Sequence, residues 1–220
     1  MAEFTDRYDA GRQLADHLAS LGWAGEVTAG VGPPVVLGLP RGGVPVAEVV
    51  ARELGAPLDV IMVRKLGVPA HPELAMGAIG EQGVRVLDAS IVRHFAVAED
   101  QIAEVERHEQ QTLQRRGALF RAGRAPLNLT RASAVIVDDG VATGATARVA
   151  CTVARHLGAA HVVLAVPVAA RDTVSRIRED GEADEVVVVA TPRFFRSVGE
   201  HYADFTAVED EHVVAILQRS

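Results

Sequence analysis

Five short apolar runs, separated by segments with helical patterns, constrain the fold of this chain most strongly. They are rich in valine and do not alternate between apolar and polar residues, which is typical of strands buried on both faces of a sheet. Strands that alternate with helices predict right-handed crossovers and a parallel sheet. The sequence therefore predicts an α/β fold with a doubly wound, mainly parallel five-stranded sheet flanked by helices. The predicted strands cover residues 35–39, 58–63, 133–137, 161–168 and 185–190.

The other segments complete a single domain over residues 1–220, with its core at about 30–190. The charged, proline-free stretch 99–121 predicts a long surface helix inserted into this core, with Arg115, Arg116 and Arg121 on its solvated face. Residues 74–88 predict a hairpin that turns at 81–83. Two prolines and a glycine predict a loop over 66–73. Apolar positions at helical spacing predict the flanking helices at 6–21, 44–54, 145–158 and 172–180.

The composition fits such a domain and excludes several classes of protein. Hydrophobic residues make up 49% of the 220 residues and the formal net charge is −7, so a sizeable core is available and a basic nucleic-acid surface is not expected. The single cysteine excludes a disulfide framework and a cysteine-based zinc site. No apolar run reaches the ~18 residues of a membrane span, and the N-terminal residues lack the apolar region of a signal peptide. We therefore expect a cytoplasmic protein without a membrane partner.

The segment after the third apolar run carries the most specific motif. Two adjacent acids, Asp138 and Asp139, leave the predicted strand, and a loop of small residues then leads into a helix. Backbone N–H groups at a helix start, with threonine hydroxyls beside them, predict a phosphate cradle. An anion site beside paired acids suits a sugar phosphate. The residues that we predict to bind the ligand here are Gly140, Val141, Ala142, Thr143, Gly144, Ala145 and Thr146.

The stretch VIVDDGVATGAT, from Val135 to Thr146, resembles the phosphoribosyl pyrophosphate (PRPP) signature of the type I phosphoribosyltransferases. It shares the apolar run, the two acids and the closing Thr-Gly-x-Thr. The resemblance extends from residue 35 to residue 190, and the stretches LPRGGVPVA and VRKLGVPAHPELAMGAI point to a little-characterised branch of the family. It implies phosphoribosyl transfer from PRPP to a nitrogenous base, or the reverse pyrophosphorolysis, with Mg²⁺ as cofactor.

A short loop after the first predicted strand fits the same resemblance. Residues 40–43 match the family's pyrophosphate loop, in which Gly42 and Gly43 expose backbone N–H groups. The guanidinium of Arg41 can bind phosphate oxygens through two parallel hydrogen bonds. We therefore place one side of the pyrophosphate site here.

The end of the second predicted strand supplies the other side. Arg64 and Lys65 match an Arg-Lys pair that precedes a mobile loop in the family, so the resemblance makes residues 66–73 a lid over the site. Lys65 is also the single lysine among 22 basic residues. Its retention in a chain that otherwise uses arginine favours a functional contact, here with pyrophosphate.

The resemblance implies a role for each of these groups. Asp138 and Asp139 hold the ribose hydroxyls, stabilise positive charge that develops on the sugar, and help to place Mg²⁺. Arg41 and Lys65 neutralise the departing pyrophosphate. The expected partners are PRPP, pyrophosphate and a nucleobase-like acceptor whose identity the sequence leaves open, and a homodimer also remains open.

The same sequence features leave two other functions to consider. The first is a regulatory protein on the same fold that binds PRPP or a nucleotide without turnover. The second is a dinucleotide-dependent oxidoreductase, but its glycine fingerprint should follow the first strand, whereas Gly30-Val31-Gly32 precedes it. The two acids and Lys65 favour the enzyme over the regulatory protein.

Base recognition in the resembled family comes from a small hood subdomain, which we expect partly from residues 191–206. Several of the few aromatic residues fall there. They allow two interpretations: a local core under the hood, or a flat surface that stacks on the base. These aromatic residues are Phe194, Phe195, Tyr202 and Phe205.

Overall fold

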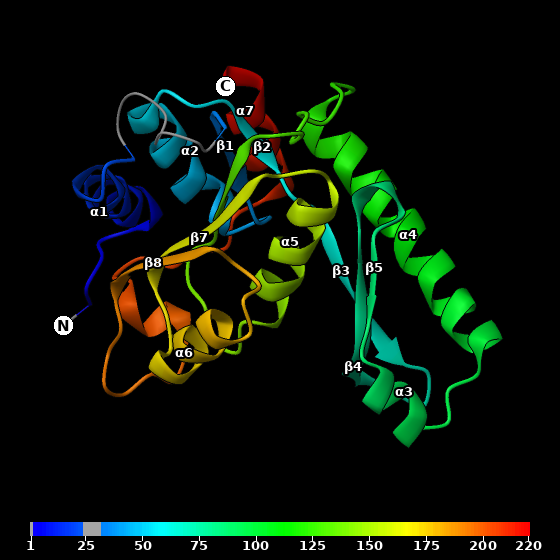
Figure 1. The fold of residues 1–220 in the computed structure, drawn as a ribbon. Coiled ribbons are helices and arrows are strands. Elements are labelled where there is room, and N and C mark those ends of the chain that lie inside the picture. Colours follow the sequence, from blue (N-terminus) through cyan, green and yellow to red (C-terminus); the bar gives the residue numbers. More distant parts are fainter. Residues whose placement is uncertain (1, 24–31) are drawn as a thin grey trace.

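The predicted strands form one parallel sheet in the order β2-β1-β6-β7-β8 (Figure 1). The strand predicted at 58–63 is shorter than expected, because it ends at Val60 and Val63 begins a strand of a second sheet. The computed structural model describes residues 2–23 and 32–220, so Gly30 and Val31 lie outside the described residues. The strands of this sheet are β1 (Pro34–Gly38), β2 (Leu58–Val60), β6 (Ser133–Val137), β7 (His161–Val168) and β8 (Glu185–Ala190). The helices are α1 (Arg7–Ser20), α2 (Gly43–Leu54), α3 (Ala89–His94), α4 (Glu99–Arg121), α5 (Ala145–His156), α6 (Arg171–Glu179) and α7 (Asp210–Arg219), with short 3-10 turns η1 (Glu81–Gly83) and η2 (Val198–His201).

Helices cover both faces of the parallel sheet, which explains its continuous apolar strands. On β1, Val36 packs into a cluster with residues of α1, α2 and α7, whereas Val35 and Leu37 pack into a second cluster with residues of α5 and α6. Neighbouring side chains of one strand point to opposite faces, so each face needs its own apolar residues. The prediction of a doubly wound parallel sheet is confirmed.

A second sheet stands to one side of the first and has the order β3-β4-β5 (Figure 1). Its antiparallel strands are β3 (Val63–Val68), β4 (His71–Gly80) and β5 (Arg85–Leu87). The predicted turn at 81–83 joins β4 to β5. The long helix α4 lies along this sheet, as Figure 1 shows, and Leu66 of β3 shares a core cluster with Ile102 and Leu113 of that helix.

The prediction of a loop over 66–73 is wrong. Val68 pairs with His71, so these residues form the tip of the β3–β4 hairpin. The two prolines occupy places where a missing N–H is tolerated, because Pro69 sits in the two-residue turn and Pro72 beside a register shift at Gly67. A Cβ on Gly67 would lie 2.5 Å from the Pro72 carbonyl oxygen, so this glycine permits the close pairing.

The prediction that Arg121 is solvated is also wrong. Arg121 is 4% exposed, and its Nε lies 2.8 Å from Asp59 Oδ1 of β2 while its Nη2 lies 2.9 Å from Glu81 Oε2. Its Nη2 also donates to the Val60 carbonyl oxygen at 2.9 Å. A charge pattern at the end of a helix does not reveal that two carboxylates of other elements lie beside it. This buried cluster joins α4 to β2 of the parallel sheet.

Among residues 2–23 and 32–220, no helix has both the length and the apolar composition needed to cross a membrane.

Candidate functional site

The carboxyl ends of β1 and β6 bring together two of the predicted segments. The strands are parallel neighbours, with Gly38 opposite Val137, so the residues that follow each strand meet at one edge of the sheet. A Cβ on Gly42 would lie 2.0 Å from Asp139 Oδ2, and a Cβ on Gly43 would lie 2.8 Å from the Asp138 Cα. The two glycines therefore let the 40–43 loop pack directly against the acid pair.

The loop after β6 forms the predicted cradle. Gly144 has a φ of 79° and caps α5, which begins at Ala145. A Cβ on Gly144 would also lie 2.7 Å from Thr173 Cγ2 of α6, so both the backbone angle and the packing require glycine. An open pocket of about 150 Å³ lies at this helix start. Its lining residues are Asp138, Gly140, Val141, Ala142, Thr143, Gly144, Ala145, Thr146, Ala147 and Val198.

The two adjacent acids lie in different surroundings. Asp138 lines the cradle pocket, and its Oδ1 accepts a hydrogen bond from the Asp139 backbone N–H at 2.9 Å. Asp139 Oδ2 lies 2.9 Å from both Nε and Nη2 of Arg7, the first residue of α1. Burial raises the pKa of the Asp138 carboxyl well above its usual range, and the charge of Asp139 adds to this rise. Burial also raises the pKa of Asp139, while the charge of Arg7 opposes that rise.

Arg41 is turned toward the start of α7. Its Nη1 lies 3.5 Å from Glu209 Oε2 and 3.6 Å from Asp210 Oδ1. Its side chain is 37% exposed, so these pairs are weak, of the order of 1 kcal/mol or less. Arg41 is thus on the loop that packs against the acids, and its guanidinium contacts two carboxylates that the sequence did not associate with it.

Arg64 and Lys65 lie on opposite faces of β3. Arg64 Nε lies 2.7 Å from Glu109 Oε2 of α4. Lys65 points the other way, like Val63, which packs against the cluster that includes Val153 of α5. The Lys65 ammonium is exposed and donates to the Glu73 carbonyl oxygen at 2.9 Å. The structure therefore places Lys65 on the face of the hairpin that looks toward α5, and Arg64 away from it.

The aromatic residues after β8 mostly form a local core. Tyr202 is 5% exposed and packs on Phe4, with ring centroids 5.3 Å apart, while Phe195 stacks on His201. Phe205 lies against the Arg7 guanidinium. Phe194 differs from the others, because it is 80% exposed.

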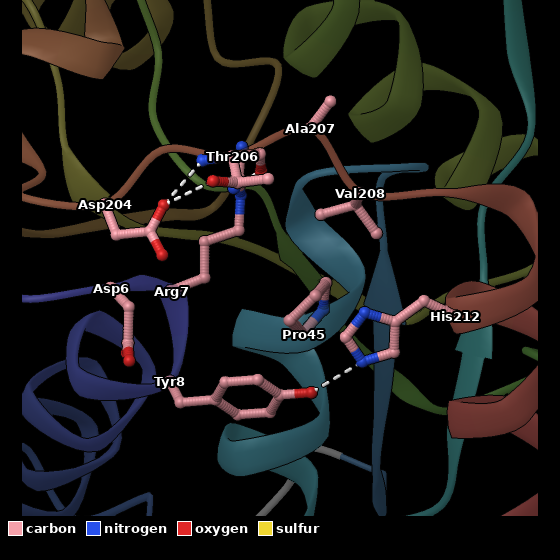
Figure 2. Close-up of a pocket in the computed structure, with 9 residues that line it drawn as sticks. All are labelled: Asp6, Arg7, Tyr8, Pro45, Asp204, Thr206, Ala207, Val208 and His212. Carbon is pink, nitrogen blue, oxygen red and sulfur yellow. Dashed lines mark hydrogen bonds between the residues drawn. The ribbon is translucent and has the colours of Figure 1, made fainter.

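Two residues that contact the acids were missed in the sequence. Arg7 binds Asp139, and Tyr202 Oη donates to the Asp139 carbonyl oxygen at 2.6 Å. Both lie more than 60 residues from Asp139 in the sequence, so no local pattern links them to it. Arg7 also lines a second pocket, where its side chain runs past Asp204 toward Thr206 (Figure 2).

The donor set at the cradle suits a hard cation such as Mg²⁺. Asp138 offers a carboxylate beside the cradle where phosphate oxygens are expected, and Mg²⁺ is commonly held by one or two carboxylates together with substrate phosphates. Within the described part of the chain, no group of three or more His, Cys, Asp or Glu side chains forms a closed metal site. The residues present therefore fit a cation shared with a phosphorylated ligand.

Comparisons with known proteins identify the family of the chain. The model of the phosphoribosyl transferase domain matches residues 5–189. Proteins of two Mycobacterium tuberculosis strains, both named "Putative phosphoribosyl transferase", are 56% identical over all 220 residues, and the chain spans 47% of their length, about half. The crystal structure of a Thermus thermophilus protein superposes with a TM-score of 0.84 at 42% identity, covering 99% of this chain and 98% of that one.

The match covers most of the chain and includes the cradle, the acid pair and the 40–43 loop. The parallel sheet and the helices on both of its faces accord with it. The chain belongs to the phosphoribosyl transferase domain family.

Proposed function

We propose that this protein transfers the phosphoribosyl group of PRPP to a nitrogenous base, with Mg²⁺ bound beside Asp138. One observation carries the proposal: the helix start at Thr143–Thr146 and the Asp138 carboxylate line one pocket, and the 40–43 loop packs against the same acids. An anion cradle and a carboxylate that line one pocket suit the 5-phosphate and the ribose of one ligand. The family membership and the names of the Mycobacterium relatives support the same reaction class.

The cradle provides binding and orientation. Backbone N–H groups at the start of α5 point out of the helix, where its dipole favours a phosphate. The hydroxyls of Thr143 and Thr146, both exposed in the pocket, are further donors. A ligand held there by its 5-phosphate presents its ribose toward Asp138.

Asp138 acts on the ribose, and the cations Arg41 and Lys65 act on the pyrophosphate. A lone pair of the base nitrogen forms the new bond to C1 of the ribose, and the bond from C1 to the pyrophosphate oxygen breaks with its electron pair on pyrophosphate. The carboxylate of Asp138 stabilises positive charge on the sugar. Arg41 and Lys65 would turn from their present carboxylate and carbonyl partners toward the negative charge of the pyrophosphate. When bound, Mg²⁺ would screen the charge of the phosphate oxygens beside Asp138.

Direct turnover tests the proposal. The protein is incubated with PRPP, Mg²⁺ and a panel of purine and pyrimidine bases, and pyrophosphate release is measured together with PRPP binding by titration calorimetry. Base-dependent release with at least one base supports the transferase. Binding without release from any base replaces it with the regulatory binding protein. Absence of binding at millimolar PRPP contradicts both.

A further inference from the structure

Arg7 holds the second acid of the pair from outside the cradle pocket. Its Nε and Nη2 both lie 2.9 Å from Asp139 Oδ2, and its Nη1 donates to the Thr206 carbonyl oxygen at 2.8 Å. The guanidinium carbon lies 4.0 Å from the centroid of the Phe205 ring. The Arg7 and Asp139 side chains are only 10% and 14% exposed. The guanidinium is therefore fixed on several sides, and its orientation is set by α1 and by residues 205 and 206.

The contacts of Asp139 leave it little freedom to reach a ligand. Its Oδ2 receives both Arg7 nitrogens on one side, and on another side the Gly42 backbone lies so close that a Cβ there would be 2.0 Å away. Its carbonyl oxygen accepts the Tyr202 hydroxyl. Asp138 lines the cradle pocket, whereas Asp139 is not among the residues that line it.

Electrostatics also distinguish Asp139 from Asp138. Two adjacent buried carboxylates repel each other, and the penalty of burying a charge is offset only by a well-placed partner. Arg7 supplies one positive charge, and both of its donor contacts go to Asp139. The positive charge of Arg7 is thus placed on Asp139.

We propose that Arg7 is a positioning residue that holds the Asp139 carboxylate against the 40–43 loop and leaves Asp138 as the carboxylate that contacts a ligand in the cradle pocket. The identity of that ligand as PRPP rests on the proposed function. The proposal departs from the expectation that both acids hold the ribose hydroxyls. It also makes the first turn of α1, far from the cradle in sequence, part of the site.

The first test compares the two acids, which serve as matched controls for each other. Asp138→Asn and Asp139→Asn each remove one charge while keeping the shape of the side chain. We expect Asp138→Asn to weaken PRPP binding, measured by titration calorimetry with Mg²⁺, at least about tenfold more than Asp139→Asn, because one charge–ligand contact is commonly of that size. Equal losses in the two variants would overturn the proposal.

The second test asks whether Arg7 acts through Asp139. Arg7→Met keeps the length of the side chain but leaves the Asp139 carboxylate buried without a cation, so PRPP binding should weaken about tenfold. Adding Asp139→Asn removes that uncompensated charge. The double variant should then bind PRPP within about threefold of Asp139→Asn alone, since residues in one network are not additive. A loss from Arg7→Met that persists unchanged in the Asp139→Asn background contradicts a role through Asp139.

Two further variants separate this role from a general effect of α1. Arg12→Met changes an exposed arginine of the same helix that pairs only loosely with Asp9, at 3.4 Å, and should leave PRPP binding unchanged. Arg7→Lys restores the charge without the planar fork and should give an intermediate affinity.

A failure of the proposed function can be distinguished from a failure of this inference. If the unchanged protein does not bind PRPP, the proposed function is wrong, and free energies of unfolding in urea decide the inference. Arg7→Met should destabilise the protein, and Asp139→Asn should restore part of that loss in the double variant. Additive losses would reject the inference.

Discussion

The parallel sheet and the β3-β4-β5 sheet present their polar residues in different ways. Both faces of the parallel sheet are covered by helices, so its polar functional residues lie beyond the strand ends, as Gly42, Asp138 and Thr143 do. In the second sheet, α4 covers one face, and charged residues stand within a strand. Arg64 faces α4 and Lys65 faces the other way. Topology alone therefore places the cradle and the acids, whereas the hairpin cations depend on which face each residue occupies.

Removing the buried Arg121 cluster, which joins α4 to β2, should have the largest effect, on stability. Arg121→Met leaves Asp59 and Glu81 buried without their cation, and breaking such a cluster commonly costs about 3–5 kcal/mol. Urea unfolding measures the loss. Arg85→Met is the matched control, because Arg85 is 44% exposed and pairs with Glu99 and Glu106 at the surface, which is worth about 1 kcal/mol or less. Equal losses would contradict the buried cluster.

A substitution at the cradle should have the next largest effect, on binding. Gly144→Ala introduces a Cβ that would lie 2.7 Å from Thr173 Cγ2, at a backbone angle that favours glycine. We expect PRPP affinity, measured by calorimetry, to fall about 100-fold, because small displacements of positioning groups have effects of that size. Gly181→Ala is the control, since Gly181 has a φ of 66° and open space around it. If both variants bind PRPP equally well, the cradle is wrongly assigned.

The two faces of β3 provide a third prediction. Lys65→Ala should lower kcat/KM for PRPP at least about tenfold, and Lys65→Arg should also lower it, because a guanidinium is not equivalent to a compact ammonium. Arg64→Ala should affect stability through the lost Glu109 contact and leave kcat/KM within about twofold. Steady-state turnover at saturating Mg²⁺ measures both. Wild-type kcat/KM in Lys65→Arg would remove any special role for the lone lysine.

The smallest expected effect is a pH-dependent gain in the stability of the Asp138→Asn variant. Because the pKa of Asp138 is raised in the folded protein, its contribution to stability is present below the unfolded pKa of about 3.9 and is lost as pH rises through the folded value. Asp138→Asn has no such loss. The variant should therefore have a higher urea midpoint than the wild type at pH 8, with a smaller difference at pH 4. A difference independent of pH would contradict the burial of an ionisable Asp138.

Much of the fold follows from local patterns, because each strand of the parallel sheet is apolar on both faces and ends in a recognisable turn. The motif from Asp138 to Thr146 is likewise contiguous, and its place after a strand locates it in the fold. The short helix α3 and the C-terminal α7 were not predicted. The two prolines at the tip of the β3–β4 hairpin predict a loop, because the sequence does not reveal which N–H groups the strand pairing uses.

The sequence carries no signal for the long-range contacts of the site. Arg7, Tyr202, Glu209 and Asp210 reach the acids or Arg41 only because α1, the segment after β8 and α7 meet beside the 40–43 loop. The same holds for Arg121. Its charge at the end of a helix predicts an exposed side chain, whereas the structure buries it against Asp59 and Glu81. Local composition predicts which residues can bind charge, and tertiary structure decides which charge they bind.

A crystal structure of the protein grown with PRPP and Mg²⁺ tests the central claim most directly. We predict the 5-phosphate on the backbone N–H groups of Thr143–Thr146, the ribose hydroxyls beside Asp138, and Arg7 still on Asp139. PRPP bound elsewhere, for example in the pocket of Figure 2 between Asp6 and Asp204, with the cradle free of phosphate, would contradict the assignment of the site.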